Sequence, residues 1–213
     1  METNILLGKH HDITAFASKD AARLTLNGVH YHHDKKLVEA TDGRVMIRVP
    51  VVEDKDGEFP SVSVNGEAKD CIIPIAPFKK ALGNVKKSSL PICEHLRLSV
   101  IEKSGTPELI INLCTTDLDT EQNVATRPID AKYPNVDQVL PTEETKFSYC
   151  LSAKILKQIA EYAERNGHAT NGTDIPVKFE FTEELLGVKF SVMLDTPMGI
   201  VKAEGMAMPM RMS

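Results

Sequence analysis

The sequence predicts an α+β fold in which short antiparallel strands are covered on one face by helices. Apolar and polar residues alternate with a period of two through most of the 213 residues, as they do in half-buried strands. Two segments instead place apolar residues at a helical spacing. Strand-like segments follow each of these helices, so one supersecondary unit recurs along the chain.

The first third of the chain has the pattern of an antiparallel meander. Asp34 to Lys36 reads as a hairpin turn and Asp42-Gly43 as a second turn signal. The polar segment 52–67 contains Gly and Pro and is predicted to be a loop, and 13–19 is the only candidate for a short helix here. The strands predicted for this part are 23–31, 37–41 and 45–51.

The first predicted helix covers Pro77 to Lys87. Phe78, Ala81, Leu82 and Val85 lie at i, i+3, i+4 and i+7, which forms one apolar stripe. Proline suits a first helical turn. The strands predicted after this helix are 96–101, 108–114 and a segment around Val124.

The second predicted helix covers Ser152 to Asn166, with Ser152 as a plausible N-cap and Gly167 as a C-terminal stop. Its predicted buried face consists of Ile155, Leu156, Ile159, Tyr162 and Ala163. The strands predicted after it are 177–181, 186–194 and 199–208.

Composition excludes several classes of protein. No stretch approaches the roughly 18–20 apolar residues of a membrane span, and the first residues lack the layout of a signal peptide. The four cysteines show no CxxC spacing, so we expect free thiols in a cytoplasmic protein and no cofactor. A net charge of -5 argues against a protein that coats nucleic acid with its whole surface, but it permits one basic face.

Three segments carry a family resemblance, and they occur in the chain in the order LVEATDGRVMIRVPV (37–51), PIDAKYPNVDQVLP (128–141) and MPMRM (208–212). Each resembles a signature segment of the bacterial DNA polymerase III beta subunit, the sliding clamp. The segments 72–87 and 147–164 each look like a clamp helix preceded by its strand. Together the similarity covers most of residues 24–213.

The resemblance implies a fold of DNA-clamp-like repeats, each a helix with antiparallel strands, and about three such half-units. Residues 1–141 resemble the middle clamp domain, and residues 142–213 resemble the C-terminal half of the last clamp domain. Family members have three domains per subunit, and two subunits close a ring. This chain holds about one and a half domains, so we expect a homo-oligomer, with trimer and tetramer both open.

The implied function is that of a non-enzymatic processivity factor. It would bind double-stranded DNA without sequence preference and dock short linear motifs of a DNA polymerase or repair protein. The alternative within the resemblance is an adaptor that binds partner peptides without encircling DNA.

In the family, partner peptides bind a hydrophobic cleft between the middle and last domains. The matching residues here are Thr41, Gly43, Arg44, Val45, Met46, Pro134, Gln138, Val139, Met206, Met208, Pro209, Met210, Arg211 and Met212. In an extended strand the four alternate methionines of the tail share one face. Unbranched, polarizable side chains suit a surface that repacks around different apolar ligands. A Met-rich strand that completes a core sheet is the structural alternative.

Family clamps present positively charged helices to DNA phosphates. The corresponding candidates here are Lys79, Lys80, Lys86, Lys87, Lys154, Lys157 and Arg165. Contacts of this kind are independent of base sequence and sensitive to salt. Glu161 and Glu164 dilute the charge of the second helix.

Five of the seven histidines lie early in the chain, at His10, His11, His30, His32 and His33. His30 and His32 would share one face of a strand, which is compatible with metal ligation. A metal-dependent hydrolase is therefore the alternative from another class, although no catalytic fingerprint accompanies the cluster.

Overall fold

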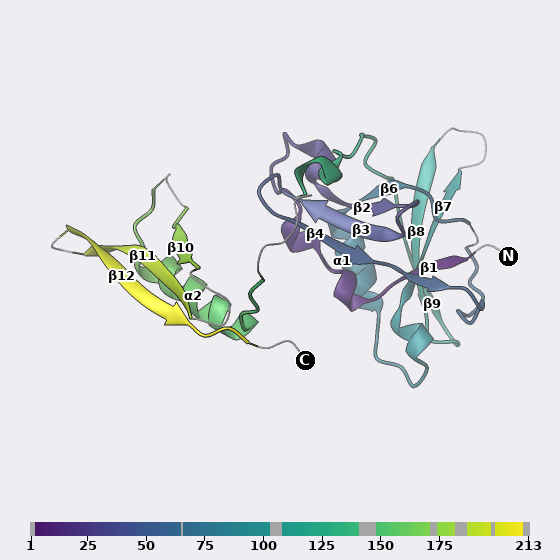
Figure 1. Ribbon diagram of the computed structural model, residues 1–213. Coiled ribbons are helices and arrows are strands. Elements are labelled where there is room, and N and C mark those ends of the chain that lie inside the picture. The colour runs from purple at the N-terminus through teal and green to yellow at the C-terminus, as the bar shows by residue number, and fades with distance from the viewer. Residues whose placement is uncertain are drawn as a thin grey trace. The chain divides into compact units, whose positions relative to one another are not determined.

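The computed structural model describes residues 3–64, 66–102, 108–140, 148–170, 174–181, 187–196 and 199–210. The chain divides into two compact units, Met1–Val139 (unit 1) and Leu140–Ser213 (unit 2). Each unit combines antiparallel sheet with helix, so the α+β prediction is confirmed (Figure 1).

Unit 1 contains two antiparallel sheets. The first has the strand order β5-β1-β7-β8-β9, and the second has the order β4-β3-β2-β6. The strands of the first sheet are β1 (Asn4–Leu7), β5 (Val52–Asp54), β7 (Leu96–Glu102), β8 (Leu109–Thr116) and β9 (Glu121–Thr126). The strands of the second are β2 (Gly28–His32), β3 (Leu37–Thr41), β4 (Met46–Pro50) and β6 (Cys71–Pro74).

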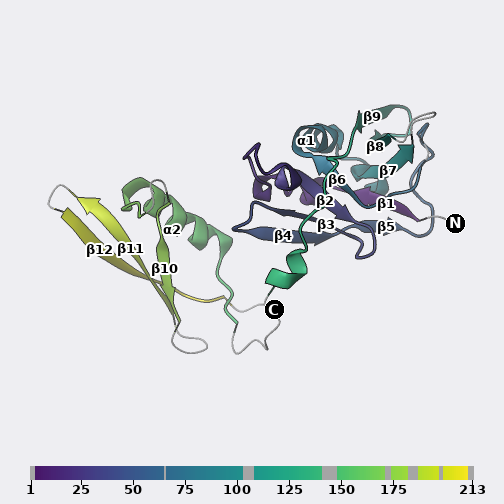
Figure 2. The ribbon, with the colours of Figure 1, turned by 90° about the horizontal axis from the view of Figure 1, so that it is seen from above.

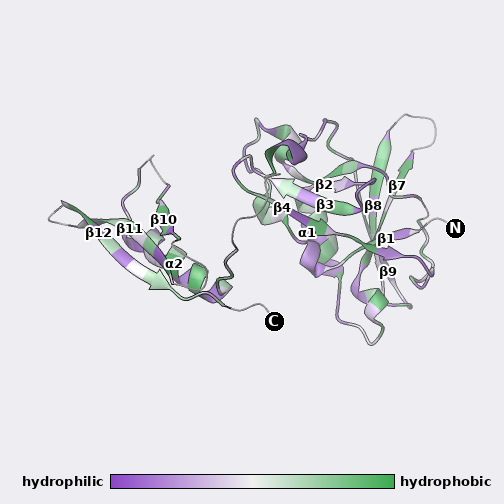
Figure 3. Ribbon diagram, viewed as in Figure 1, coloured by the Kyte–Doolittle hydropathy of each residue, from purple (hydrophilic) through white to green (hydrophobic). Residues whose placement is uncertain are grey.

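Helix α1 (Ile75–Asn84) packs against both sheets of unit 1 (Figure 2). Its residues Phe78, Ala81 and Leu82 are buried in the core. That core also takes apolar side chains from β1, β2, β3, β6, β7, β8 and β9. Strand β8, which lies between β7 and β9, is mostly hydrophobic in Figure 3, as expected for an interior strand of a packed sheet.

Unit 2 consists of helix α2 (Ala153–Asn166) and one sheet of order β10-β11-β12 among its described residues. The strands are β10 (Val177–Glu180), β11 (Val188–Thr196) and β12 (Gly199–Ala207). Helix α2 lies along one face of this sheet and alternates hydrophobic and hydrophilic residues (Figures 1 and 3).

Two sequence predictions about element bounds were wrong. The segment 23–31 does not begin as a strand, because Leu24–Leu26 forms a 3₁₀ turn before β2. The first helix ends at Asn84 rather than Lys87, since Val85 takes an extended conformation and buries its side chain. Gly83 and Asn84 are both weak helix formers, which favours an end at this point.

The short helix considered for 13–19 is a single 3₁₀ turn, Thr14–Phe16. The predicted loop 52–67 begins with the short strand β5. No helix among the described residues is long and apolar enough to cross a membrane.

Candidate functional site

The turn between β3 and β4 holds the first group of predicted site residues in a defined shape. The Thr41 hydroxyl donates to the Val45 carbonyl at 2.7 Å and accepts the Gly43 amide at 3.0 Å. The Asp42 carboxylate accepts the backbone amides of Arg44 and Val45 at 2.8 and 3.0 Å. Thr41 is therefore buried and structural, whereas the side chain of Val45 is 46% exposed.

Gly43 has a φ of +91°, which L side chains rarely adopt. A Cβ at this position would also lie 3.1 Å from a guanidinium nitrogen of Arg23. Arg23 in turn donates to the Asp42 carbonyl at 3.0 Å. The glycine therefore serves the shape of the turn.

The second predicted segment packs against the same sheet. Tyr133 and Val136 are buried in a small cluster with Ile72 of β6, and Met46 at the start of β4 packs against this cluster. The cluster brings the start of β4 close to the segment that contains Tyr133 and Val136. The 3₁₀ turn Val136–Val139 follows directly.

Among the predicted residues of these two segments, the exposed ones are Gly43, Arg44, Val45, Pro134, Gln138 and Val139. Val139 is the most exposed of the large apolar side chains in this group, at 74%. Met46 packs against the cluster of Tyr133 and Val136, and we use the name β4 surface for Met46 and the residues near these in sequence, Val45, Pro134, Gln138 and Val139.

A row of ionic contacts fixes the base of the β4 surface. Arg48 of β4 donates to Glu39 of β3 at 2.7 Å, and Glu39 accepts from His30 of β2 at 2.9 Å. Arg48 also reaches Asp137 at 2.7 Å, and Lys35 forms a second ion pair with Asp137. These pairs attach the 3₁₀ turn to the sheet.

Both ring nitrogens of His30 contact carboxylates. Its Nδ1 faces Glu39 and its Nε2 lies 2.8 Å from Asp70, while the ring stacks on Tyr133 at 4.5 Å. Burial alone lowers the pKa of His30, but the hydrogen bonds to Glu39 and Asp70 outweigh it, so the pKa is raised. Burial likewise raises the pKa of Glu39, but its hydrogen bonds with His30 and Arg48 outweigh burial and lower it. The arrangement fits a doubly protonated imidazolium between two carboxylates.

These shifts predict a pH dependence of stability. A raised histidine pKa contributes stability that is complete below about pH 6.5 and is lost as pH rises through the folded-state pKa. In urea unfolding followed by circular dichroism, the free energy of unfolding should fall as the pH rises above about 6.5. The variant His30→Gln should show a weaker fall than the wild type. An unchanged pH profile in His30→Gln would contradict this assignment.

In unit 2, the side chains of Met206 and Met208 lie on the same side of the sheet, over Gly187. A Cβ on Gly187 would lie 2.4 Å from the Met206 sulfur and 3.5 Å from that of Met208. The Met210 amide donates to the Cys150 carbonyl at 2.7 Å, and Pro209 is half-buried. Met206, Met208 and Met210 are 67%, 56% and 55% exposed, so they form an apolar surface rather than a core. Arg211 and Met212 lie outside the described residues.

The candidate DNA contacts of unit 1 do not all lie on one helix. Lys79 and Lys80 are exposed on α1, whereas Lys86 and Lys87 are exposed in the segment that follows Val85. The prediction of a single helical lysine face was wrong for this pair, because the helix ends earlier. No acidic residue occurs in 75–87, so the segment is uniformly basic.

On α2 the basic residues are partly neutralised. Lys157 and Arg165 each approach Glu161 at 3.7 Å, and Lys154 is exposed one turn earlier. Helix α2 therefore offers a weaker positive surface than α1 does.

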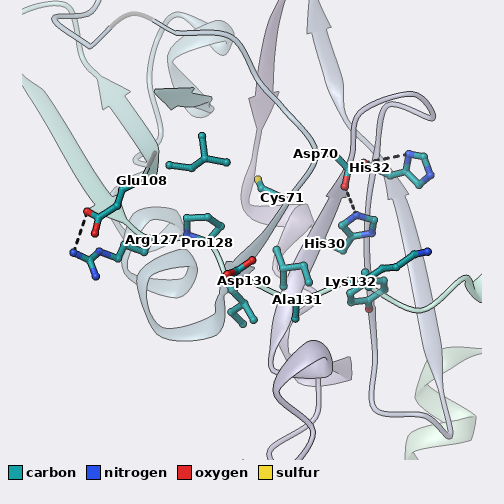
Figure 4. A pocket seen from close by; sticks show the side chains of 14 residues that line it. His30, His32, Asp70, Cys71, Glu108, Arg127, Pro128, Asp130, Ala131 and Lys132 are labelled. Atoms are coloured by element: carbon teal, nitrogen blue, oxygen red, sulfur yellow. Dashed lines mark hydrogen bonds and ion pairs between the residues drawn. The ribbon is translucent and has the colours of Figure 1, made fainter. Parts of the chain in front are cut away.

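A cavity of about 650 Å³ in unit 1 is lined in part by His30 and His32 (Figure 4). Asp70 lies between His30 and His32 on one side, and Arg127 pairs with Glu108 at 3.2 Å on the other. His30 and Asp70 contact each other, as do Arg127 and Glu108, whereas the buried Nδ1 of His32 lies 3.8 Å from Asp70 and has no hydrogen-bond partner in the described structure.

The early histidines have structural partners. His11 is buried, accepts the Gly8 amide at 2.9 Å and lies 2.9 Å from the Pro50 carbonyl. Both ring nitrogens of His30 are occupied by carboxylates, so neither is available for a metal. In the described part of the chain, no group of three or more His, Cys, Asp or Glu residues could hold a metal ion.

Sequence reasoning missed Glu39, Arg48, Asp137 and Tyr133. The pairing of Glu39 with Arg48 could have been predicted from the strand register of the β3–β4 hairpin, because charged residues opposite each other on adjacent strands can form a pair. Asp137 and Tyr133 come from a segment that is distant in sequence, and no local signal indicates their partners.

The comparisons with known proteins bear on the fold. No family model matches the sequence, and no curated protein sequence matches it. Among solved structures the chain is similar to the beta sliding clamp of C. crescentus, crystallised with PEG bound to a proposed beta-motif tethering region. The identity is 14% and the TM-score is 0.60, over 97% of this chain and 50% of the clamp chain. The chain therefore has a sliding-clamp-like fold and spans half the length of that clamp.

Proposed function

We propose that the chain is a sliding-clamp-like processivity factor that binds duplex DNA through basic residues and docks peptides of a polymerase or repair protein. The observation that carries the proposal is the clamp-like fold over 97% of the chain. The three family-like segments support it independently.

The uniformly basic segment 75–87 supports the DNA-binding part. Lys79, Lys80, Lys86 and Lys87 are exposed, and among the described residues they form no ion pair. Unpaired lysines can neutralise phosphates and release counterions, which gives affinity without base readout. Lys154, Lys157 and Arg165 are proposed as secondary contacts because of Glu161.

Duplex binding tests this part directly. We expect two 30-base-pair duplexes of unrelated sequence to bind with equal affinity in fluorescence anisotropy. The Lys→Ala variant at positions 79, 80, 86 and 87 should lower the slope of log K against log salt by about 0.9 for each lost phosphate contact. The matched control replaces the exposed Lys9, Lys19, Lys55 and Lys69 with alanine. Equal loss in both variants would count against a specific DNA face.

The β4 surface and the exposed methionines support the peptide-binding part. Both are apolar, and the ionic row beneath the β4 surface holds it in place. Apolar anchors of an extended peptide are recognised by surfaces of this kind. We propose that Thr41 and Gly43 shape the turn, and that Arg44, Pro209, Arg211 and Met212 also contribute to peptide binding.

A charged residue on the β4 surface should weaken peptide binding. The probe is a labelled hexapeptide with leucine at alternate positions, and the variant is Val45→Glu. We expect at least about a tenfold loss of affinity, equal to 1.4 kcal/mol. Leu90→Glu is the control, because Leu90 is 44% exposed in the same unit. Peptide binding without any duplex binding would favour the adaptor alternative over the processivity factor.

A further inference from the structure

Unit 1 is made of two half-units that exchange their first strands. Strand β1 begins the first half-unit but pairs with β7 of the second. Strand β6 begins the second half-unit but pairs with β2 of the first. Each half-unit therefore completes the sheet of the other. The exchanged strand pairs with the free edge of the first strand after the helical segment, which is β7 in one case and β2 in the other.

Burial in unit 1 depends on this exchange. Ile73 of β6 pairs with Val29, and Leu7 of β1 pairs with Leu96. All four side chains are fully buried in the shared core. Neither half-unit alone would cover its own apolar face.

Unit 2 repeats the order of one half-unit. A segment that includes 148–151 precedes α2, and β10, β11 and β12 follow it. The family resemblance predicts a strand before this helix, but 148–151 does not pair as a strand in the described structure. The outer edge of β10 is also unpaired among the described strands, at the position where β2 and β7 receive their exchanged strands.

The α2 side of this sheet is an open apolar surface. A cavity of about 370 Å³ is lined mainly by apolar side chains, among them Ile155, Ile159, Phe190 and Val192. Tyr162, which also lines the cavity, is 46% exposed, and Leu156 of α2 and Val201 of β12 are exposed at 41% and 44%.

The opposite face of the sheet carries charged pairs. Lys189 lies 3.2 Å from Glu204, and Lys178 lies 2.8 Å from Glu180. That face also carries the exposed Met206, which lies opposite Lys189, so it mixes charged and apolar side chains, whereas the α2 face resembles half of a core.

We propose that unit 2 of a second copy of this chain covers this face, so that two half-units from two chains form one complete clamp-type domain. Each copy donates the strand before its α2 to the free edge of β10 in the other, and the two helices pack over a joint core. Unit 1 provides the template for this exchange within the same chain.

The choice of a second copy follows from complementarity and length. Unit 2 offers both halves of the contact, a donor segment and an acceptor edge, so two identical surfaces satisfy each other about a two-fold axis. The chain also matches 50% of the C. crescentus clamp chain, so two copies supply the length of one such chain. A pair of chains would then contain three clamp-type domains.

The register of the exchanged strand follows from which side chains face the core. In unit 1, Ile73 lies two positions before α1, and its side chain is buried in the core. Leu7 lies two positions before the first 3₁₀ turn, and its side chain is buried in the same core. The equivalent residue of unit 2 is Leu151. Val177 of β10 pairs with Val192, which lines the α2 cavity, so Leu151 is placed opposite Val177 of the other copy. Cys150 then lies opposite Lys178.

The mass of the full chain in solution tests the pairing. Sedimentation equilibrium should give an even number of 23.5 kDa chains, dissociating on dilution. Leu156→Lys should weaken this association at least tenfold, because it places a charge in the joint core. Glu164→Gln makes the same change in charge at an exposed position of α2 and should leave the association unchanged. We take a dissociation constant of roughly 100 µM as the upper limit for a specific contact. A wild-type chain that is monomeric at this concentration therefore overturns the proposal.

Cross-linking tests the strand exchange itself. Cys71, Cys93 and Cys114 are buried, so Cys150 is the more accessible native thiol. In the variant Lys178→Cys, oxidation by diamide should join Cys150 of one copy to position 178 of the other, since directly opposite residues of a strand pair lie close enough for a disulfide. Lys202→Cys on β12 is the control and should not form this bridge. A bridge within one chain, or none, overturns the exchange.

These outcomes are separate from the proposed function. The pairing depends on the fold of unit 2, and neither Leu156 nor Lys178 belongs to the proposed DNA or peptide contacts. Loss of DNA binding in the lysine variant of unit 1 would not count against the proposed pairing of unit 2.

Discussion

Replacing Phe78 with alanine is expected to lower the free energy of unfolding of unit 1 by about 3–5 kcal/mol. Phe78 is fully buried on α1, between side chains from both sheets. Its removal leaves a cavity that these neighbours cannot close without moving α1.

The measurement is urea unfolding of the full chain, compared with the wild type. Leu24→Ala is the control, because Leu24 is 56% exposed and its truncation should change the free energy by no more than about 0.5 kcal/mol. Equal small losses in both variants would show that α1 does not contribute to the core as described.

Replacing Glu39 with alanine is expected to cost about 3–5 kcal/mol, since it removes the shared partner of two cations. The side chain of Glu39 is 3% exposed and accepts from both His30 and Arg48. Without it, the ring of His30 retains Asp70 as its carboxylate partner, and the partly buried guanidinium of Arg48 retains Asp137.

Glu102→Ala is the matched control, because Glu102 pairs with Lys69 at 3.5 Å with 70% of its side chain exposed. Exposed pairs of this kind contribute no more than about 1 kcal/mol. The Glu39 variant should also weaken peptide binding, since the ionic row holds the base of the β4 surface. A stable Glu39→Ala protein with normal binding would show that the row is dispensable.

Local patterns were sufficient for several elements. Strand β3 was predicted at its observed bounds, 37–41, because turn residues flank an alternating segment. The bounds of helix α2 were also predicted closely, since Ser152 and Gly167 bracket an apolar stripe. The prediction of its buried face was wrong for Leu156 and Tyr162, which are 41% and 46% exposed. The sliding-clamp resemblance, carried by three short segments, agreed with the fold found by structural similarity.

Other features depend on contacts between distant residues. Leu24 and Leu26 alternate as in a strand, yet they form a 3₁₀ turn, because tertiary packing overrides a short local pattern. Tyr133 stacks on His30, a residue a hundred positions away that sequence reasoning had considered as a metal ligand. The partners of the histidine, and therefore its charge, are decided by the folded sheet.

By itself the sequence determined the fold class, the helices, most strands and the segments that resemble a clamp, because each depends on neighbouring residues. Only the tertiary structure decided the exchange of β1 and β6, the ionic row beneath the β4 surface and the open apolar face of unit 2. Each of these joins residues far apart in the chain, and a pairing of that kind is selected by the burial that the whole unit achieves.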